Sequence, residues 1–83
     1  MMSKDDLLEM LAEEEALLAD GFDDALVGCT YGANVVAVYD IMKMIDVLMK
    51  EDMSHDDAVE YLDYNVVSAY MGDKTPKYIN LVS

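Results

Sequence analysis

The residues best suited to chemistry lie in one short stretch, where three carboxylates surround the only histidine. They are Asp52, His55, Asp56 and Asp57. Carboxylates and imidazole bind metal ions, but a metal site needs ligands that converge in space, and adjacency in sequence does not provide that. The spacing also lacks the glycine and the distant glutamate of a calcium-binding loop. We therefore interpret the acids as linker and helix-start charges and expect neither a metal nor another cofactor.

Cys29 is the only cysteine, and together with His55 it raises the question of a nucleophile and a general base. A cysteine inside an apolar strand usually acts as a small hydrophobic residue, and the sequence provides no third group to orient the histidine. Glycine-rich phosphate loops are also absent from the sequence. We therefore expect that the protein is not an enzyme. A single cysteine excludes an internal disulfide, and with no signal-peptide pattern at the N-terminus it favours a cytoplasmic location.

Charge is the most unusual property of the chain. Its 83 residues include 18 Asp and Glu but only 5 Lys and no Arg, for a formal net charge of −13. Phosphate backbones are bound by basic side chains, so a chain this acidic should be repelled by DNA and RNA. We expect no direct binding to nucleic acid.

The carboxylates fall into two rows on the expected outer faces of two helices. The rows consist of Asp5, Asp6, Glu9 and Glu13 in the first helix and of Asp56, Glu60 and Asp63 in the third. Acids four residues apart are separated by ~6 Å along a helix, which is similar to the phosphate spacing of a DNA strand. Such a surface can act as a DNA mimic that binds a host protein with a basic surface. The alternative is a solvated surface that keeps an apolar protein soluble.

Four elements are predicted before the tail. Ser3 starts an N-terminal helix in the range 1–20, and Gly21 is its predicted stop. Glu15, however, falls on the apolar face of this helix. Either the helix breaks near residues 13–15, or its apolar face is shallow there. Residues 25–39 are rich in β-branched and aromatic residues and predict an antiparallel hairpin with its turn at 32–34. A central helix over 40–52 and a third helix over 54–71, capped by Ser54, follow.

The two later helices carry more apolar surface than one core requires. In the central helix, apolar side chains cover well over half the circumference, whereas one core needs a stripe of roughly 100°. The third helix has an inward face that includes Leu62 and Tyr70, and a second apolar stripe on another side. Because a short chain buries only somewhat over ~60% of its unfolded surface, we expect a homodimer. Its predicted interface is Met44, Val47, Tyr64, Val67 and Met71.

The tail, residues 72–83, supplies a candidate third strand after Pro76. Its residues are strand-like, and it can pair with the hairpin of its own chain or with that of a partner. The predicted fold is therefore a single α+β domain in the order α-β-β-α-α with a candidate C-terminal strand. Because no apolar run approaches the ~20 residues of a membrane helix, we expect no membrane association.

Three stretches resemble a family of small acidic proteins from tailed bacteriophages and prophages. They are residues 21–28 (Gly-Phe-Asp-Asp-Ala-Leu-Val-Gly), residues 37–40 (Ala-Val-Tyr-Asp) and residues 53–72, followed by Thr75 and Pro76. The family pattern includes Tyr61, Tyr64, Asn65, Tyr70 and Gly72, whereas the loop at 31–34 is shorter and less basic than the family's. The resemblance implies a phage origin and a host-cytoplasm setting, and it implies no reaction.

Two functions remain open from the sequence. The first is a phage-type accessory protein that binds and inhibits a host protein through its carboxylates, for example a restriction, CRISPR or transcription component. The second is a homodimeric interaction or structural module in which the apolar surface matters and the acidity is incidental.

Overall fold

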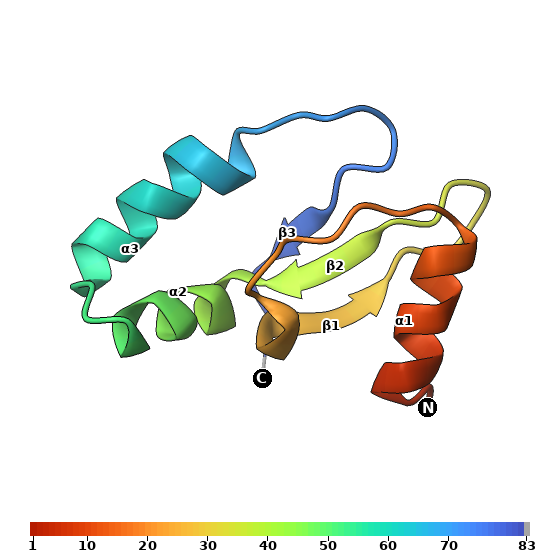
Figure 1. The fold of residues 1–83 in the computed structure, drawn as a ribbon, viewed down its shortest axis with the longest axis horizontal. Helices are drawn as coiled ribbons and strands as arrows, with labels where there is room; N and C mark the ends of the chain where they lie inside the picture. The colour runs from red at the N-terminus through yellow and green to blue at the C-terminus, as the bar shows by residue number, and fades with distance from the viewer. Residues whose placement is uncertain (83) are drawn as a thin grey trace.

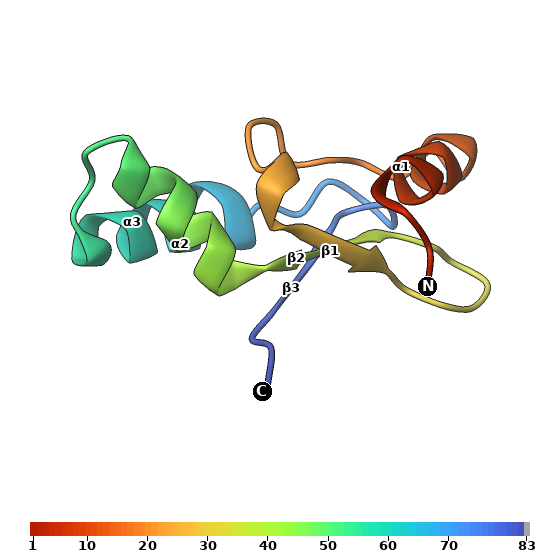
Figure 2. The same ribbon diagram turned by 90° about the horizontal axis from the view of Figure 1, so that it is seen from below.

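A three-stranded sheet lies between α1 at one end of the molecule and the α2–α3 pair at the other (Figures 1 and 2). The computed structural model describes residues 1–82. Its elements are α1 (Lys4–Glu13), the 3-10 turn η1 (Asp23–Ala25), β1 (Leu26–Cys29), β2 (Ala37–Asp40), α2 (Ile41–Lys50), α3 (His55–Leu62), the π-helical turn η2 (Asp63–Val67) and β3 (Lys77–Ile79). The predicted α+β class and the order of the elements are confirmed.

The central strand of the sheet is β2, which pairs antiparallel with β1 and parallel with β3. Tyr39 of β2 is opposite Leu26 of β1 and Tyr78 of β3. A parallel pair needs a long crossover connection, and α2, α3 and the loop after them provide it. The tail therefore pairs with its own chain, which answers the alternative that the sequence left open.

The N-terminal helix ends at Glu13, so the predicted range of 1–20 is wrong beyond that residue. Glu15 takes a left-handed conformation with φ 56°, and its N–H donates to the carbonyl of Ala12 while the N–H of Ala16 donates to Leu11. This pattern is a Schellman motif, which satisfies the last carbonyls of a helix. The sequence allowed either a break in the helix near Glu15 or a shallow apolar face there, and the structure shows the break.

The end of α2 repeats this motif with Asp52. Asp52 has φ 71°, its N–H donates to Met49, and the N–H of Met53 donates to Leu48. Both helices thus place an acidic residue where glycine is favoured, because a side chain is strained in the left-handed region.

A Glu15→Gly variant should be more stable than the wild type by about 0.5–1 kcal/mol, because glycine relieves this strain. Urea unfolding followed by circular dichroism measures the change. Glu15→Gln is the matched control, since it removes the same charge and keeps a side chain in the left-handed region. If the two variants gain the same stability, relief of charge repulsion is the cause and the strain argument is wrong.

One core joins α1, the sheet, α2 and α3. Its buried residues are Leu7, Leu11, Phe22, Ala25, Leu26, Ala37, Tyr39, Met44, Ile45, Leu48, Ala58 and Leu62. Met44, predicted at the dimer interface, is 0% exposed within its own chain and cannot contact a second copy, so that assignment is corrected. The chain itself covers one side of α2 through Met44, Ile45 and Leu48, while Met42 and Met49 stay exposed.

The third helix also differs from its prediction. Regular α-helix ends at Leu62, five residues of π-helix follow, and the chain leaves the helix after Val67 instead of Met71. Tyr70, predicted to face inward, is 76% exposed. Within residues 1–82, no helix combines the length and the apolar character that crossing a membrane requires.

Candidate functional site

Five large side chains are exposed together on α3, η2 and the loop that follows. We call them the aromatic face; they are Tyr61, Tyr64, Val67, Tyr70 and Met71. Tyr64 and Tyr70 are each 76% exposed, which is unusual for residues that normally bury much of their area. Scattered apolar residues are normal on a surface, but a group on one segment marks a candidate binding site.

The segment of the aromatic face includes the π-helical turn η2. A π turn leaves the α-helical hydrogen-bond pattern, and two polar side chains bond to the carbonyls four residues earlier. Asn65 Nδ2 donates to the carbonyl of Tyr61 (3.1 Å), and Ser68 Oγ donates to that of Tyr64 (2.9 Å). No residue of η2 is buried. π turns are rare and are frequently found at functional sites.

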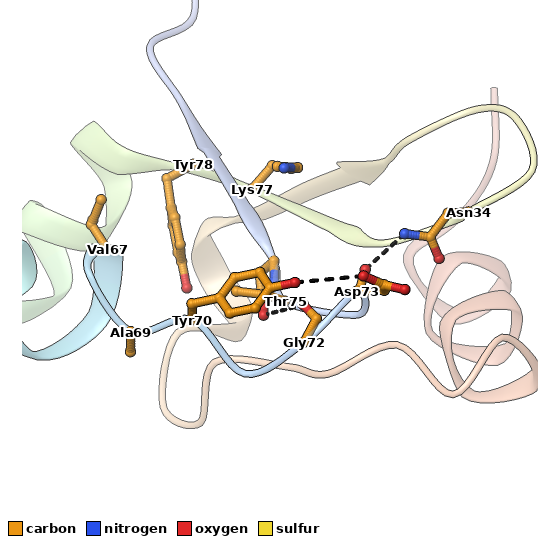
Figure 3. Close-up of a pocket in the computed structure, with 10 residues that line it drawn as sticks. Asn34, Val67, Ala69, Tyr70, Gly72, Asp73, Thr75, Lys77 and Tyr78 are labelled. Atoms are coloured by element: carbon orange, nitrogen blue, oxygen red, sulfur yellow. Dashed lines mark hydrogen bonds between the residues drawn. The ribbon is translucent and has the colours of Figure 1, made fainter.

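Hydrogen bonds fix the loop that carries Tyr70. Asn34 Nδ2, from the β1–β2 loop, donates to the carbonyl of Asp73 (2.7 Å), and Thr75 Oγ1 donates to that of Gly72 (2.7 Å). Figure 3 shows the Tyr70 hydroxyl directed at the Asp73 carboxylate, with 3.5 Å between the oxygens. The loop is thereby held to the hairpin, and Tyr70 is held at the surface.

Three shallow depressions follow the aromatic face. The first, about 480 Å³, lies between the loop and β3 and includes Val67 and Tyr70 (Figure 3). The second, about 260 Å³, shares Ala69, Pro76 and Tyr78 with the first. The third, about 400 Å³, shares Tyr61 and Asn65 with the second, and Met53, Asp57, Glu60 and Tyr64 complete it. Neighbouring depressions share lining residues, and all three lie along the segment that carries the aromatic face.

Comparisons with protein-family models, with curated proteins and with solved structures give no match. The resemblance to a phage family therefore stays a prediction.

The acidic residues predicted as one interaction surface lie on two separate parts of the molecule. Asp5, Asp6, Glu9 and Glu13 are exposed on α1, and Asp56, Glu60 and Asp63 are exposed on α3 and at the start of η2. Figures 1 and 2 both place α1 and α3 at opposite ends of the long axis. The two rows do not combine into one continuous surface, and only the row on α3 reaches a depression that Tyr61 and Tyr64 line, through Glu60.

Three of the five residues predicted at a dimer interface belong to the aromatic face: Tyr64, Val67 and Met71. Val47 is half-buried on α2 and packs against the core of its own chain, where Met44 is fully buried. These three residues are exposed as the sequence predicted, but they lie on η2 and on the loop after it instead of on one regular helix, and their role at an interface stays a prediction. The sequence analysis did not predict the π turn or the exposure of Tyr70. Asn65 and Ser68, whose polar side chains can bond to a helix backbone, are the sequence feature that could have indicated an irregular turn.

The residues considered for metal binding and catalysis are not assembled into a site. Within residues 1–82, no three His, Cys, Asp or Glu side chains are close enough to hold a metal ion. His55 pairs with Asp56, with 3.7 Å between Nδ1 and Oδ1, and both side chains are exposed. Cys29 Sγ lies 3.7 Å from Met10 Sδ of α1, at the other end of the molecule from His55.

Two tyrosines of the sheet support the floor of the site. Tyr39 is buried, its hydroxyl accepts the N–H of Ala19 (2.8 Å), and its ring stacks on Tyr78 with 6.0 Å between centroids. Burial raises the pKa of Tyr39, partly offset by the Ala19 hydrogen bond, and nearby Asp23 and Asp20 raise it further. Burial also raises the pKa of Tyr78, which lines two of the depressions. Tyr39 thus ties the segment before η1 and strand β3 to the core.

Proposed function

We propose that this protein is a protein–protein interaction module that binds a partner through the aromatic face. The observation that carries the proposal is the exposed aromatic face bordered by carboxylates. Tyrosine is enriched at the energetic centres of interfaces, because its large ring buries apolar area while its hydroxyl forms hydrogen bonds. The fixed loop and the side-chain bonds of η2 present these residues with little disorder to be lost on binding.

The carboxylates beside the aromatic face favour a basic partner over a second copy of the chain. Asp57 and Glu60 line the third depression, and Asp63 follows on η2. A symmetric dimer through this face whose two-fold axis passes near these acids would bring the same acids of two copies together, and juxtaposed like charges are unfavourable by several kcal/mol. A partner with basic residues around an apolar contact would be attracted instead. In the setting that the phage resemblance implies, this partner is a host protein of the cytoplasm.

A second candidate is an inhibitor that uses its carboxylates alone, as a DNA mimic. Its support is the net charge of −13 and the row of Asp5, Asp6, Glu9 and Glu13, all exposed on α1. In that case the α1 row forms the contact and the aromatic face is not needed.

One capture experiment separates the two candidates. The immobilised wild-type protein should retain a host protein from bacterial lysate. The double variant Tyr64→Asp/Val67→Asp should no longer retain that protein, whereas the double variant Glu9→Lys/Glu13→Lys should still retain it. Retention by the aromatic face should weaken only in part between about 0.1 M and about 1 M salt, because the screening length falls from ~10 Å to ~3 Å while the apolar contact is not screened. Loss with the lysine pair alone, at either salt concentration, would support the DNA mimic and contradict our proposal.

Sedimentation velocity of the same three proteins addresses the homodimer. Under our proposal the wild type sediments as a monomer. A dimer that Tyr64→Asp/Val67→Asp dissociates would show that the aromatic face binds a second copy of this chain and not a basic partner.

A further inference from the structure

We infer that the third depression binds an arginine side chain of the partner. In the partner's sequence, apolar residues flank this arginine. The inference rests on the proposed function and specifies the chemistry of the partner. The depression lies along α3 and the start of η2, where Asp57, Glu60, Tyr61 and Tyr64 recur at the three- and four-residue spacing that places side chains on one face. Two aromatic rings and two carboxylates thus border one open space of about 400 Å³.

The carboxylates of this depression have no cation of their own. Among residues 1–82 the ion pairs are His55 with Asp56 and Lys74 with Glu14, so neither Asp57 nor Glu60 is paired. None of the five lysines lines the depression. An incoming cation therefore meets two free carboxylates without displacing an existing partner.

The aromatic rings favour arginine over other cations. A guanidinium is planar and weakly hydrated, so it stacks on a tyrosine face while its forked N–H groups donate to a carboxylate. Lysine offers a compact, strongly hydrated charge that fits this combination less well. Met53, half-buried at the start of the depression, supplies an adaptable apolar contact for the residues that flank the arginine.

A fluorescent peptide of alternating leucine and arginine is the probe, measured by anisotropy against the full chain. Its two companions replace arginine with lysine or with citrulline, which keeps the shape of arginine and removes its charge. We expect the arginine peptide to bind about 10-fold more tightly than the citrulline peptide and about 3-fold more tightly than the lysine peptide, in line with a desolvated charge-assisted contact and a cation–π term.

Matched variants locate the contact. Asp57→Asn/Glu60→Gln should remove most of the preference for arginine over citrulline, and Tyr64→Leu should weaken arginine binding about 3-fold. Glu9→Gln/Glu13→Gln on α1 changes the net charge equally at the other end of the molecule and should leave the preference intact. Melting curves of each variant confirm that it is folded.

The outcomes distinguish this inference from the proposed function. Equal binding of the arginine and citrulline peptides, both lost in Tyr64→Asp, overturns the arginine site and leaves the aromatic face as the binding surface. Peptide binding that is unchanged in Tyr64→Asp contradicts both. An equal loss of the arginine preference in the α1 pair and in the α3 pair shows diffuse attraction by the net charge and overturns the arginine site.

Discussion

A Tyr39→Ala variant should lose about 3–5 kcal/mol of its free energy of unfolding, the range for truncating a large buried aromatic residue. Tyr39 is 0% exposed, stacks on Tyr78 and accepts the N–H of Ala19, so alanine leaves a cavity and an unpaired donor together. For a chain of this size the total is about 4–12 kcal/mol, so the variant should be close to unfolding. Urea unfolding followed by circular dichroism measures the loss. Tyr31→Ala, which truncates an exposed tyrosine, should change stability by less than about 0.5 kcal/mol.

Tyr39→Phe keeps the ring and removes only the hydroxyl, so it stays measurable if the alanine variant unfolds. Its expected loss is about 1 kcal/mol, because the Ala19 N–H loses its acceptor. The raised pKa of Tyr39 adds a pH test. The unfolded state ionises first, near pH ~10, so the stabilisation is complete below that pH and is lost as the pH rises through the folded pKa.

Wild type should therefore lose more stability than Tyr39→Phe between about pH 8 and about pH 11. Burial also raises the pKa of Tyr78, and Tyr39 raises it further, so the difference between the two proteins includes the part of the Tyr78 shift that depends on Tyr39. A parallel pH dependence of the two proteins would show that the hydroxyl of Tyr39 is not buried in the folded state.

The fold was predictable wherever local chemistry and periodicity agreed. Ser3 and Ser54 each cap a helix through a side-chain oxygen, as the sequence predicts, and Asp40 does so at the start of the predicted central helix. The hairpin and the third strand also followed from β-branched and aromatic residues. The length of the first helix was left open, because Glu15 conflicts with its apolar face and only the backbone shows that the conflict ends the helix.

The site was predictable only in part, for a geometric reason. The stripe of Tyr64, Val67 and Met71 was found by assuming a regular α-helix, and these residues are indeed exposed. A π turn changes the direction of every later side chain, so Tyr70 was placed inward by the same assumption. Periodicity also cannot place two helices relative to each other. The sequence therefore predicted that the acidic residues of α1 and α3 belong to one interaction surface, although the sheet lies between the two helices.

A Met44→Ala variant should lose about 2–5 kcal/mol of its free energy of unfolding, as other buried Met and Leu truncations do. Met44 lies on the inner side of α2 and is fully buried in the core of its own chain. Its loss should therefore be the same at every protein concentration. Urea midpoints of wild type and variant, measured over a roughly 100-fold range of protein concentration, test this expectation.

Met42→Ala is the matched control, since it removes the same side chain from an exposed position of α2 and should change stability by less than about 0.5 kcal/mol. If α2 instead formed a dimer interface, the wild-type midpoint would rise with protein concentration, because association stabilises the folded state by mass action. Met44→Ala would then abolish that rise, and the assignment of Met44 to the core of its own chain would be wrong. A midpoint independent of concentration, lowered equally throughout by Met44→Ala, assigns Met44 to the core of its own chain and excludes α2 as a dimer interface.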